Sequence, residues 1–181
     1  MKRLEYLDVA KGIGILLVYI GHCFLNPESW SFRWIYSFHM PLFFFISGML
    51  FNFHRDDGLK LYALKKTISL LVPYILFTVV YLAIYSFVMH YDVLPFILMG
   101  WGRIPLWFIP VLFLIEILYA MMIGRNKLIK AVSLSLVLCL FIYKVRTNGW
   151  LPYCVSEIPW FMLCFASGTM LRLAPPLVAV Q

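Results

Sequence analysis

The chain has 181 residues, of which 64% are hydrophobic and only 13% are charged, and its mean hydropathy is +0.91. Soluble domains contain about a quarter charged residues, so this composition excludes a soluble globular protein and predicts an integral membrane protein. The net charge of +7 does not indicate a nucleic-acid partner, because the basic residues lie in short polar segments between apolar runs.

Six apolar runs, each bounded by polar or helix-breaking residues, predict six transmembrane helices. The runs cover residues 8–25, 34–53, 67–89, 105–124, 131–143 and 157–173. A span of about 20 residues crosses a hydrocarbon core of about 30 Å, so the fifth run is short and has to recruit Lys130 or Lys144, whose side chains can snorkel. We expect an all-α, polytopic membrane helix bundle that forms a single domain over residues 1–181.

The distribution of lysine and arginine predicts the topology. With a cytoplasmic N-terminus, eleven basic residues lie on the inner side and four on the outer side. The inner ones are Lys2, Arg3, Lys11, Arg55, Lys60, Lys65, Lys66, Arg125, Lys127, Lys130 and Arg172, and the outer ones are Arg33, Arg103, Lys144 and Arg146. The positive-inside rule therefore places both termini in the cytoplasm.

Three polar residues share one face of the first predicted helix, in the stretch DVAKGIGILLVYIGH. Lys11 and His22 are eleven residues apart, so they face the same way, about 16 Å apart along the axis. Asp8 precedes Lys11 by three residues and is close enough to pair with it. Ionisable residues within a membrane span are costly, on the order of 3 kcal/mol each, and are candidates for function.

The second predicted helix brings a second histidine to a similar depth. His39 lies about 7 Å, and His22 about 5 Å, below the expected outer boundary at 1.5 Å per residue. Each histidine taken singly could equally be a packing residue that bonds a neighbouring helix. Together they indicate a polar site that opens outward.

Further along the chain, Arg55, Lys60, Lys65 and Lys66 form a basic cluster before the third predicted helix. It fits either an inner loop that contacts anionic headgroups or a dock for a phosphate-rich cytosolic donor.

In the fourth helix, Glu116 is either a structural partner of a basic or hydroxyl group or part of the site. The four cysteines form no CxxC pair and no zinc spacing with the four histidines, so no metal is expected.

Four fragments in order, LDVAKGIGILLVYIGH, FHMPLFFFISGMLF, LKKTISLLVPYI and PLWFIPVLFLIEIL, resemble the membrane-bound acyltransferase 3 family. The similarity is closest to its sugar (fucose-type) O-acetyltransferase branch and covers about residues 4–118. It implies transfer of an acyl group, usually acetyl from acetyl-coenzyme A, to a hydroxyl of a cell-envelope carbohydrate, by a multi-pass protein of the bacterial inner membrane. Full members have about ten helices, so the resemblance also predicts a chain truncated at its C-terminus.

The resemblance also implies residue roles. His22 corresponds to the catalytic histidine, and Lys11 to a basic residue that is arginine in many members. Lys65 and Lys66, with Arg55 nearby, correspond to residues that hold the phosphates of coenzyme A.

From the chemistry of the residues, we expect His22 to act as general base, while an acyl-histidine intermediate stays open. His39 would orient the acceptor or stabilise the oxyanion, and Lys11 with Asp8 would shape the donor channel. Two other readings stay open: a small-molecule or amino-acid transporter, in which His, Lys and Glu also line interior faces, and an inactive membrane fragment.

Overall fold

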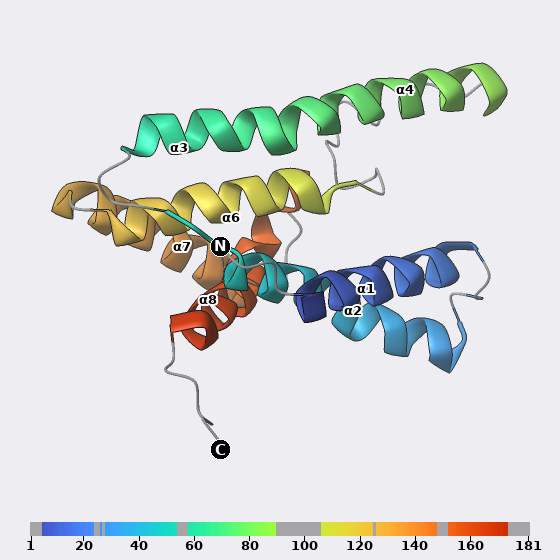
Figure 1. The fold of residues 1–181 in the computed structure, drawn as a ribbon, viewed down its shortest axis with the longest axis horizontal. Coiled ribbons are helices and arrows are strands. Elements are labelled where there is room, and N and C mark those ends of the chain that lie inside the picture. Colours follow the sequence, from blue (N-terminus) through green and yellow to red (C-terminus); the bar gives the residue numbers. More distant parts are fainter. Residues whose placement is uncertain are drawn as a thin grey trace. The chain divides into compact units, whose positions relative to one another are not determined.

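The computed structural model describes residues 5–23, 26, 28–53, 58–89, 106–124, 126–147 and 152–173. These residues form helices and short connections, with no strand among them (Figure 1). The helices are α1 (Glu5–Cys23), α2 (Trp30–Met49), α3 (Leu59–Lys66), α4 (Val72–Met89), α6 (Phe108–Ile123), α7 (Lys127–Thr147) and α8 (Ile158–Leu173), with a π-helical turn at Thr67–Leu71 and a 3-10 helix at Pro152–Glu157. The predicted all-α class is confirmed.

Four helical segments of the described chain are long and apolar enough to cross a membrane. They are Glu5–Cys23, Leu59–Val88, Lys127–Thr147 and Cys154–Arg172. Helix α6 is apolar but has only 16 residues. Helix α2 has 20 residues, but its arginine, histidine and serine side chains lower its hydropathy. The structure thus agrees with a helical membrane protein.

Two helices extend well beyond the spans predicted for them. The third span was predicted to begin at residue 67, but its helix begins at Leu59, because α3, the π-helical turn and α4 form one continuous helix (Figure 1). The fifth span was predicted as residues 131–143 but extends over Lys127–Thr147, 21 residues. In both cases the helix continues through lysines that flank the apolar run, because lysine is a good helix former and can snorkel from a helix end.

The π-helical turn lies just before a proline within the long helix. Pro73 has no N–H, and its ring would clash with the carbonyl four residues earlier in a regular α-helix. In the π-helical turn Val72 instead donates to the Thr67 carbonyl, five residues back. The chain therefore passes Pro73 without ending the helix.

The chain divides into two compact units, residues 1–51 with 161–181, and residues 52–160. In the first unit, α1 and α2 lie side by side (Figure 1). Ser29 caps α2, since its hydroxyl accepts from the Phe32 N–H at 3.2 Å. Two buried glycines of α1 face α2: a Cβ on Gly14 would lie 3.0 Å from the Phe43 ring.

In this first unit, helices α2 and α8 pack so closely that their backbones are in contact. A Cβ on Gly48 would overlap the Phe165 carbonyl, and one on Gly168 would overlap the Phe45 carbonyl. The Thr169 hydroxyl donates to the Gly48 carbonyl at 3.1 Å across the same crossing. Small residues are required at this crossing because the two backbones leave no room for a side chain.

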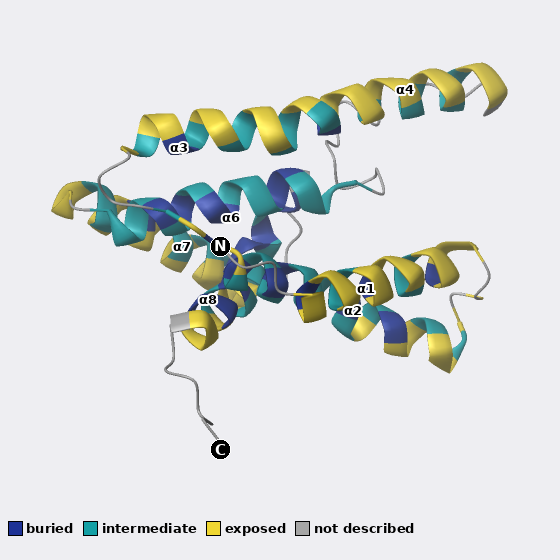
Figure 2. Cartoon of the chain, viewed as in Figure 1, coloured by how far each residue is buried: buried dark blue, intermediate teal, exposed yellow. Residues whose placement is uncertain are grey.

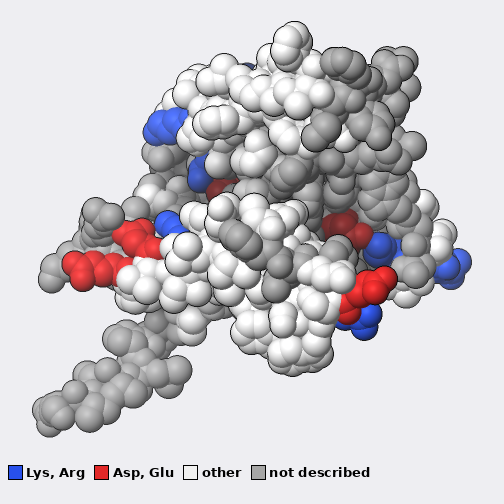
Figure 3. All heavy atoms as spheres, turned by 90° about the vertical axis from the view of Figure 1, so that its right-hand side faces the viewer, with Lys and Arg blue, Asp and Glu red and all other residues white. Residues whose placement is uncertain are grey.

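Large apolar side chains remain exposed on several helices. Only 6% of the apolar window in Leu59–Val88 is buried, and Phe87 is 83% exposed (Figure 2). Among the described residues on the face drawn in Figure 3, charged side chains are few and form small patches separated by uncharged ones. Such a surface suits contact with lipid or with other membrane helices, and not with water.

Candidate functional site

A histidine and a tyrosine meet near the end of α1. His22 is the penultimate residue of α1 and is exposed. The Tyr36 hydroxyl of α2 lies 3.1 Å from its Nδ1 and 3.0 Å from its Nε2, and the two rings meet edge to face with centroids 5.5 Å apart. The hydroxyl can therefore donate to whichever ring nitrogen carries no proton, or accept from the one that does.

A glycine makes room for this contact. A Cβ on Gly21 would lie 2.9 Å from Cε2 of Tyr36. Real side chains do not approach so closely, so any larger residue at position 21 would displace the tyrosine ring. The small residue next to His22 thus brings the Tyr36 hydroxyl within reach of the imidazole.

His39 joins the same cluster through the tyrosine. It is 2% exposed, and its Nδ1 lies 2.8 Å from the Ile35 carbonyl. Because a carbonyl only accepts, Nδ1 carries the proton, and the lone pair of the neutral ring is on Nε2. Its ring meets the Tyr36 ring edge to face at 4.8 Å. Tyr36 therefore contacts both histidines.

The prediction that the two histidines reach a similar depth needs refinement. Helix α2 begins at Trp30 behind its Ser29 cap, four residues before the predicted start. The residue level with His22 is Tyr36, and His39 lies three residues, or about 4.5 Å, further along the helix. The structure thus brings the two histidines into one cluster, with a tyrosine between them that the sequence analysis did not single out.

The other two predicted residues of α1 form an ion pair. Lys11 Nζ lies 3.7 Å from Asp8 Oδ1, and their side chains are 38% and 42% exposed. An exposed pair of this kind contributes at most about 1 kcal/mol to stability. By helix geometry Lys11 is about 16 Å from His22 along α1, so it is not in the histidine cluster.

A second polar cluster lies in the other unit, around the buried Glu116 of α6. Glu116 Oε2 accepts from the Tyr62 hydroxyl at 2.9 Å and lies 2.6 Å from Lys66 Nζ. The ammonium group is also 5.6 Å from the centroid of the Tyr62 ring. The sequence left two roles open for Glu116, a structural partner of a basic or hydroxyl group and a part of the site. In the structure Glu116 pairs with a basic group, Lys66, and with a hydroxyl group, Tyr62.

The predicted donor-binding residues are therefore not equivalent. Lys66 is paired with Glu116, whereas Lys65 is exposed. Arg55 lies outside the described residues. Tyr62, which contributes the hydroxyl to Glu116, was not singled out from the sequence, although its position four residues before Lys66 puts both on one helix face.

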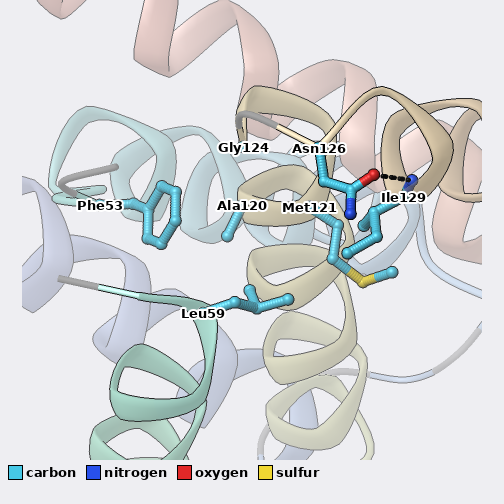
Figure 4. A pocket seen from close by; sticks show the side chains of 7 residues that line it. All are labelled: Phe53, Leu59, Ala120, Met121, Gly124, Asn126 and Ile129. Atoms are coloured by element: carbon cyan, nitrogen blue, oxygen red, sulfur yellow. Dashed lines mark hydrogen bonds between the residues drawn. The ribbon is translucent and has the colours of Figure 1, made fainter. Parts of the chain in front are cut away.

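A small pocket in the same unit lies between the start of α3 and the turn from α6 to α7. It is lined by Phe53, Leu59, Ala120, Met121, Gly124, Asn126 and Ile129 (Figure 4). The Asn126 side chain accepts from the backbone N–H groups of Leu128 and Ile129 and so caps α7. With a volume of about 110 Å³, the pocket is smaller than the 300–1,000 Å³ typical of ligand sites.

No group of three or more His, Cys, Asp or Glu side chains that could hold a metal ion occurs among the described residues. The cysteines there, Cys23, Cys139, Cys154 and Cys164, are thiols and not parts of disulfides. The chemistry that the described side chains offer is that of histidine, tyrosine and lysine: proton transfer, hydrogen bonding and binding of anions.

The sequence model of a family described as "Acyltransferase domain" matches residues 4–179 of the chain. The match includes both polar clusters and extends beyond residue 118, where the similarity of the four fragments ends. No curated protein and no solved structure matches the chain.

Proposed function

The chain belongs to the membrane acyltransferase 3 family, and from this premise we propose that it transfers an acetyl group from acetyl-coenzyme A to a hydroxyl of a cell-envelope carbohydrate. The family makes it an acyltransferase. The donor, the acceptor and the sugar O-acetyltransferase branch are the proposal. It is supported by the order of the four fragments in the sequence and by the histidine cluster of α1 and α2.

The observation that carries the proposal is the environment of His22. Its ring is exposed, so an acceptor can reach it, and the Tyr36 hydroxyl lies within hydrogen-bonding distance. A sugar hydroxyl is a poor nucleophile near neutral pH and needs a base to remove its proton as it attacks. Imidazole is suited to this task because its ordinary pKa is close to neutral pH.

In the proposed reaction, His22 takes the proton of the acceptor hydroxyl while the oxygen attacks the thioester carbonyl. The tetrahedral intermediate collapses with cleavage of the carbon–sulfur bond, and the thiolate that leaves takes up the proton. Tyr36 orients the imidazole through its hydroxyl. His39, whose Nδ1 proton is directed to Ile35, supports the Tyr36 ring from the other side.

We propose that the chain is a multi-pass protein of the bacterial cell membrane with cytoplasmic termini. The charge bias of eleven inner to four outer basic residues supports this orientation. In it, Lys11 and Asp8 lie towards the cytoplasmic donor and His22 towards the outside. Helix α1 would then extend from the donor side to the acceptor side.

The test is the His22→Ala variant of the full-length protein, assayed in membrane vesicles for incorporation of labelled acetyl groups into envelope carbohydrate. We expect a loss of about 10²- to 10⁴-fold in rate, as is typical for removal of a general base, with normal membrane insertion. The control is Cys23→Ala, which alters the exposed neighbouring residue. Unchanged acetylation in His22→Ala would refute the role of His22.

A further inference from the structure

Two adjacent lysines of the long helix have different environments. Lys66 Nζ lies 2.6 Å from Glu116 Oε2, and the two side chains are only 27% and 5% exposed. Tyr62 donates to the same carboxylate oxygen at 2.9 Å. This oxygen thus binds a cation and a hydroxyl from one helix face, and the contact joins α3 to α6.

Releasing Lys66 would leave a buried charge without its partner. If Lys66 turned away to bind a phosphate, the buried Glu116 would keep the Tyr62 hydroxyl but lose its cation. An uncompensated buried charge is strongly unfavourable. A phosphate ligand would have to compete with Glu116 for Lys66, whereas an exposed lysine requires no such exchange.

Lys65 is such an exposed lysine. It follows Leu64 and is rotated by about 100° from Lys66 on the helix. It lies on the exposed stripe that includes Leu61, Leu64 and Ile68. The structure shows no ion pair between Lys65 and any other described residue, so its ammonium group is available to an anion.

We propose that these two lysines have different roles. Lys65 contacts a phosphate of the acyl donor, and Lys66 is a positioning residue that Glu116 and Tyr62 hold in place, so that the basic end of the long helix stays fixed on α6. The inference rests on the proposed function, since it assigns the donor contact within that reaction. The family resemblance implied that both lysines bind the phosphates of coenzyme A, and the present proposal assigns that contact to Lys65 alone.

The test compares Lys65→Met and Lys66→Met in the full-length protein in nanodiscs of neutral lipid. Methionine keeps the length of the apolar stem and removes the charge. For Lys65→Met we expect KM for acetyl-coenzyme A to rise about tenfold, as for loss of one charge-assisted hydrogen bond, without a change in Tm. For Lys66→Met we expect a lower Tm, which the double variant Lys66→Met with Glu116→Gln restores, because no buried charge then lacks a partner.

The matched control is Lys127→Met, which removes an exposed lysine at the start of α7, outside the basic cluster, and should leave KM and Tm unchanged. If KM rose in the double variant Lys66→Met with Glu116→Gln but not in Lys65→Met, the proposed roles of the two lysines would be wrong. Nanodiscs with anionic lipid separate the two sources of phosphate. If Lys65→Met changed only the dependence on anionic lipid and not KM, Lys65 would bind headgroups and the donor assignment would be wrong.

Direct binding of labelled coenzyme A distinguishes this inference from the proposed function. A wild-type protein that binds no coenzyme A would refute the proposed donor and, with it, the role of Lys65. The Tm comparison would still decide whether Glu116 holds Lys66. An unchanged Tm in Lys66→Met would overturn the positioning role even if acetyl transfer is confirmed.

Discussion

The α1–α2 hairpin and the contact between the long helix and α6 each contain a tyrosine hydroxyl directed at a titratable side chain. In the hairpin, Tyr36 contacts the exposed ring of His22. On α6, Tyr62 and Lys66 both bind Glu116, which is 4% exposed. The first arrangement leaves its titratable group accessible to a substrate, whereas the second satisfies its group internally. A tyrosine hydroxyl thus contacts an accessible side chain in one unit and takes part in a contact between two helices in the other.

The largest effect is expected from removing the carboxylate in the second cluster. Glu116→Ala leaves the partly buried Lys66 and the Tyr62 hydroxyl without their shared partner. Breaking a buried pair in this way costs about 3–5 kcal/mol, so we expect little folded protein in membrane extracts. Thermal unfolding of the purified protein measures the loss.

The control for that experiment is Glu157→Ala. Glu157 pairs with Lys144 at 2.5 Å, but the two side chains are 28% and 20% exposed. The carboxylate removed here is partly exposed, so water can take its place beside Lys144, whereas Glu116 is buried; the loss should therefore be smaller than for Glu116→Ala. An equal loss in both variants would contradict the distinction between a buried and a partly exposed pair.

The next effect concerns the room that Gly21 leaves for Tyr36. Gly21→Ala would place a Cβ 2.9 Å from Cε2 of the ring, so the ring has to move away from His22. If the tyrosine orients the base, we expect the acetylation rate to fall by about 10- to 100-fold, since small displacements of catalytic groups have effects of this size. The rate in vesicles, at equal protein content, is the measurement.

Gly12→Ala is the matched variant on the same helix. A Cβ there meets nothing within 4 Å, and alanine is a better helix former than glycine. Its rate should equal that of the wild-type protein. If Gly12→Ala were as slow as Gly21→Ala, the cause would be a property of α1 as a whole and not the contact with Tyr36.

The smallest effect is expected from removing the hydroxyl alone. Tyr36→Phe keeps the ring between His22 and His39 and deletes the hydrogen bond to the imidazole. A loss of about tenfold or less in kcat, with Tm unchanged, corresponds to one hydrogen bond of about 1 kcal/mol. Tyr6→Phe, at an exposed position of α1, serves as control, and equal rates in Tyr36→Phe and the wild-type protein would refute the orienting role.

Much of this architecture follows from the sequence because it depends on local composition and helical period. Apolar runs long enough to span a bilayer can satisfy their backbone groups only as helices or closed barrels, and the pattern of a barrel is missing. The spacing of Asp8, Lys11 and His22 placed them on one face, and the structure has the Asp8–Lys11 pair. The family was likewise evident from four fragments and is confirmed by the match over residues 4–179.

Other features depended on contacts between residues that are distant in the sequence. The partner of Lys66 lies 50 positions later, at Glu116, and nothing in the composition around Lys65 and Lys66 distinguishes one lysine from the other. Tyr36 was missed for a similar reason, since its importance arises from the glycine opposite it on α1.

The sequence by itself determined the membrane class, the helical architecture and the candidate residues, because hydrophobicity and the 3.6-residue period are properties of short segments. Only the tertiary structure decided which of those residues are paired and which are accessible. Burial and pairing depend on the side chains that a neighbouring helix presents, and these determine whether His22, Lys65 and Lys66 can meet a substrate.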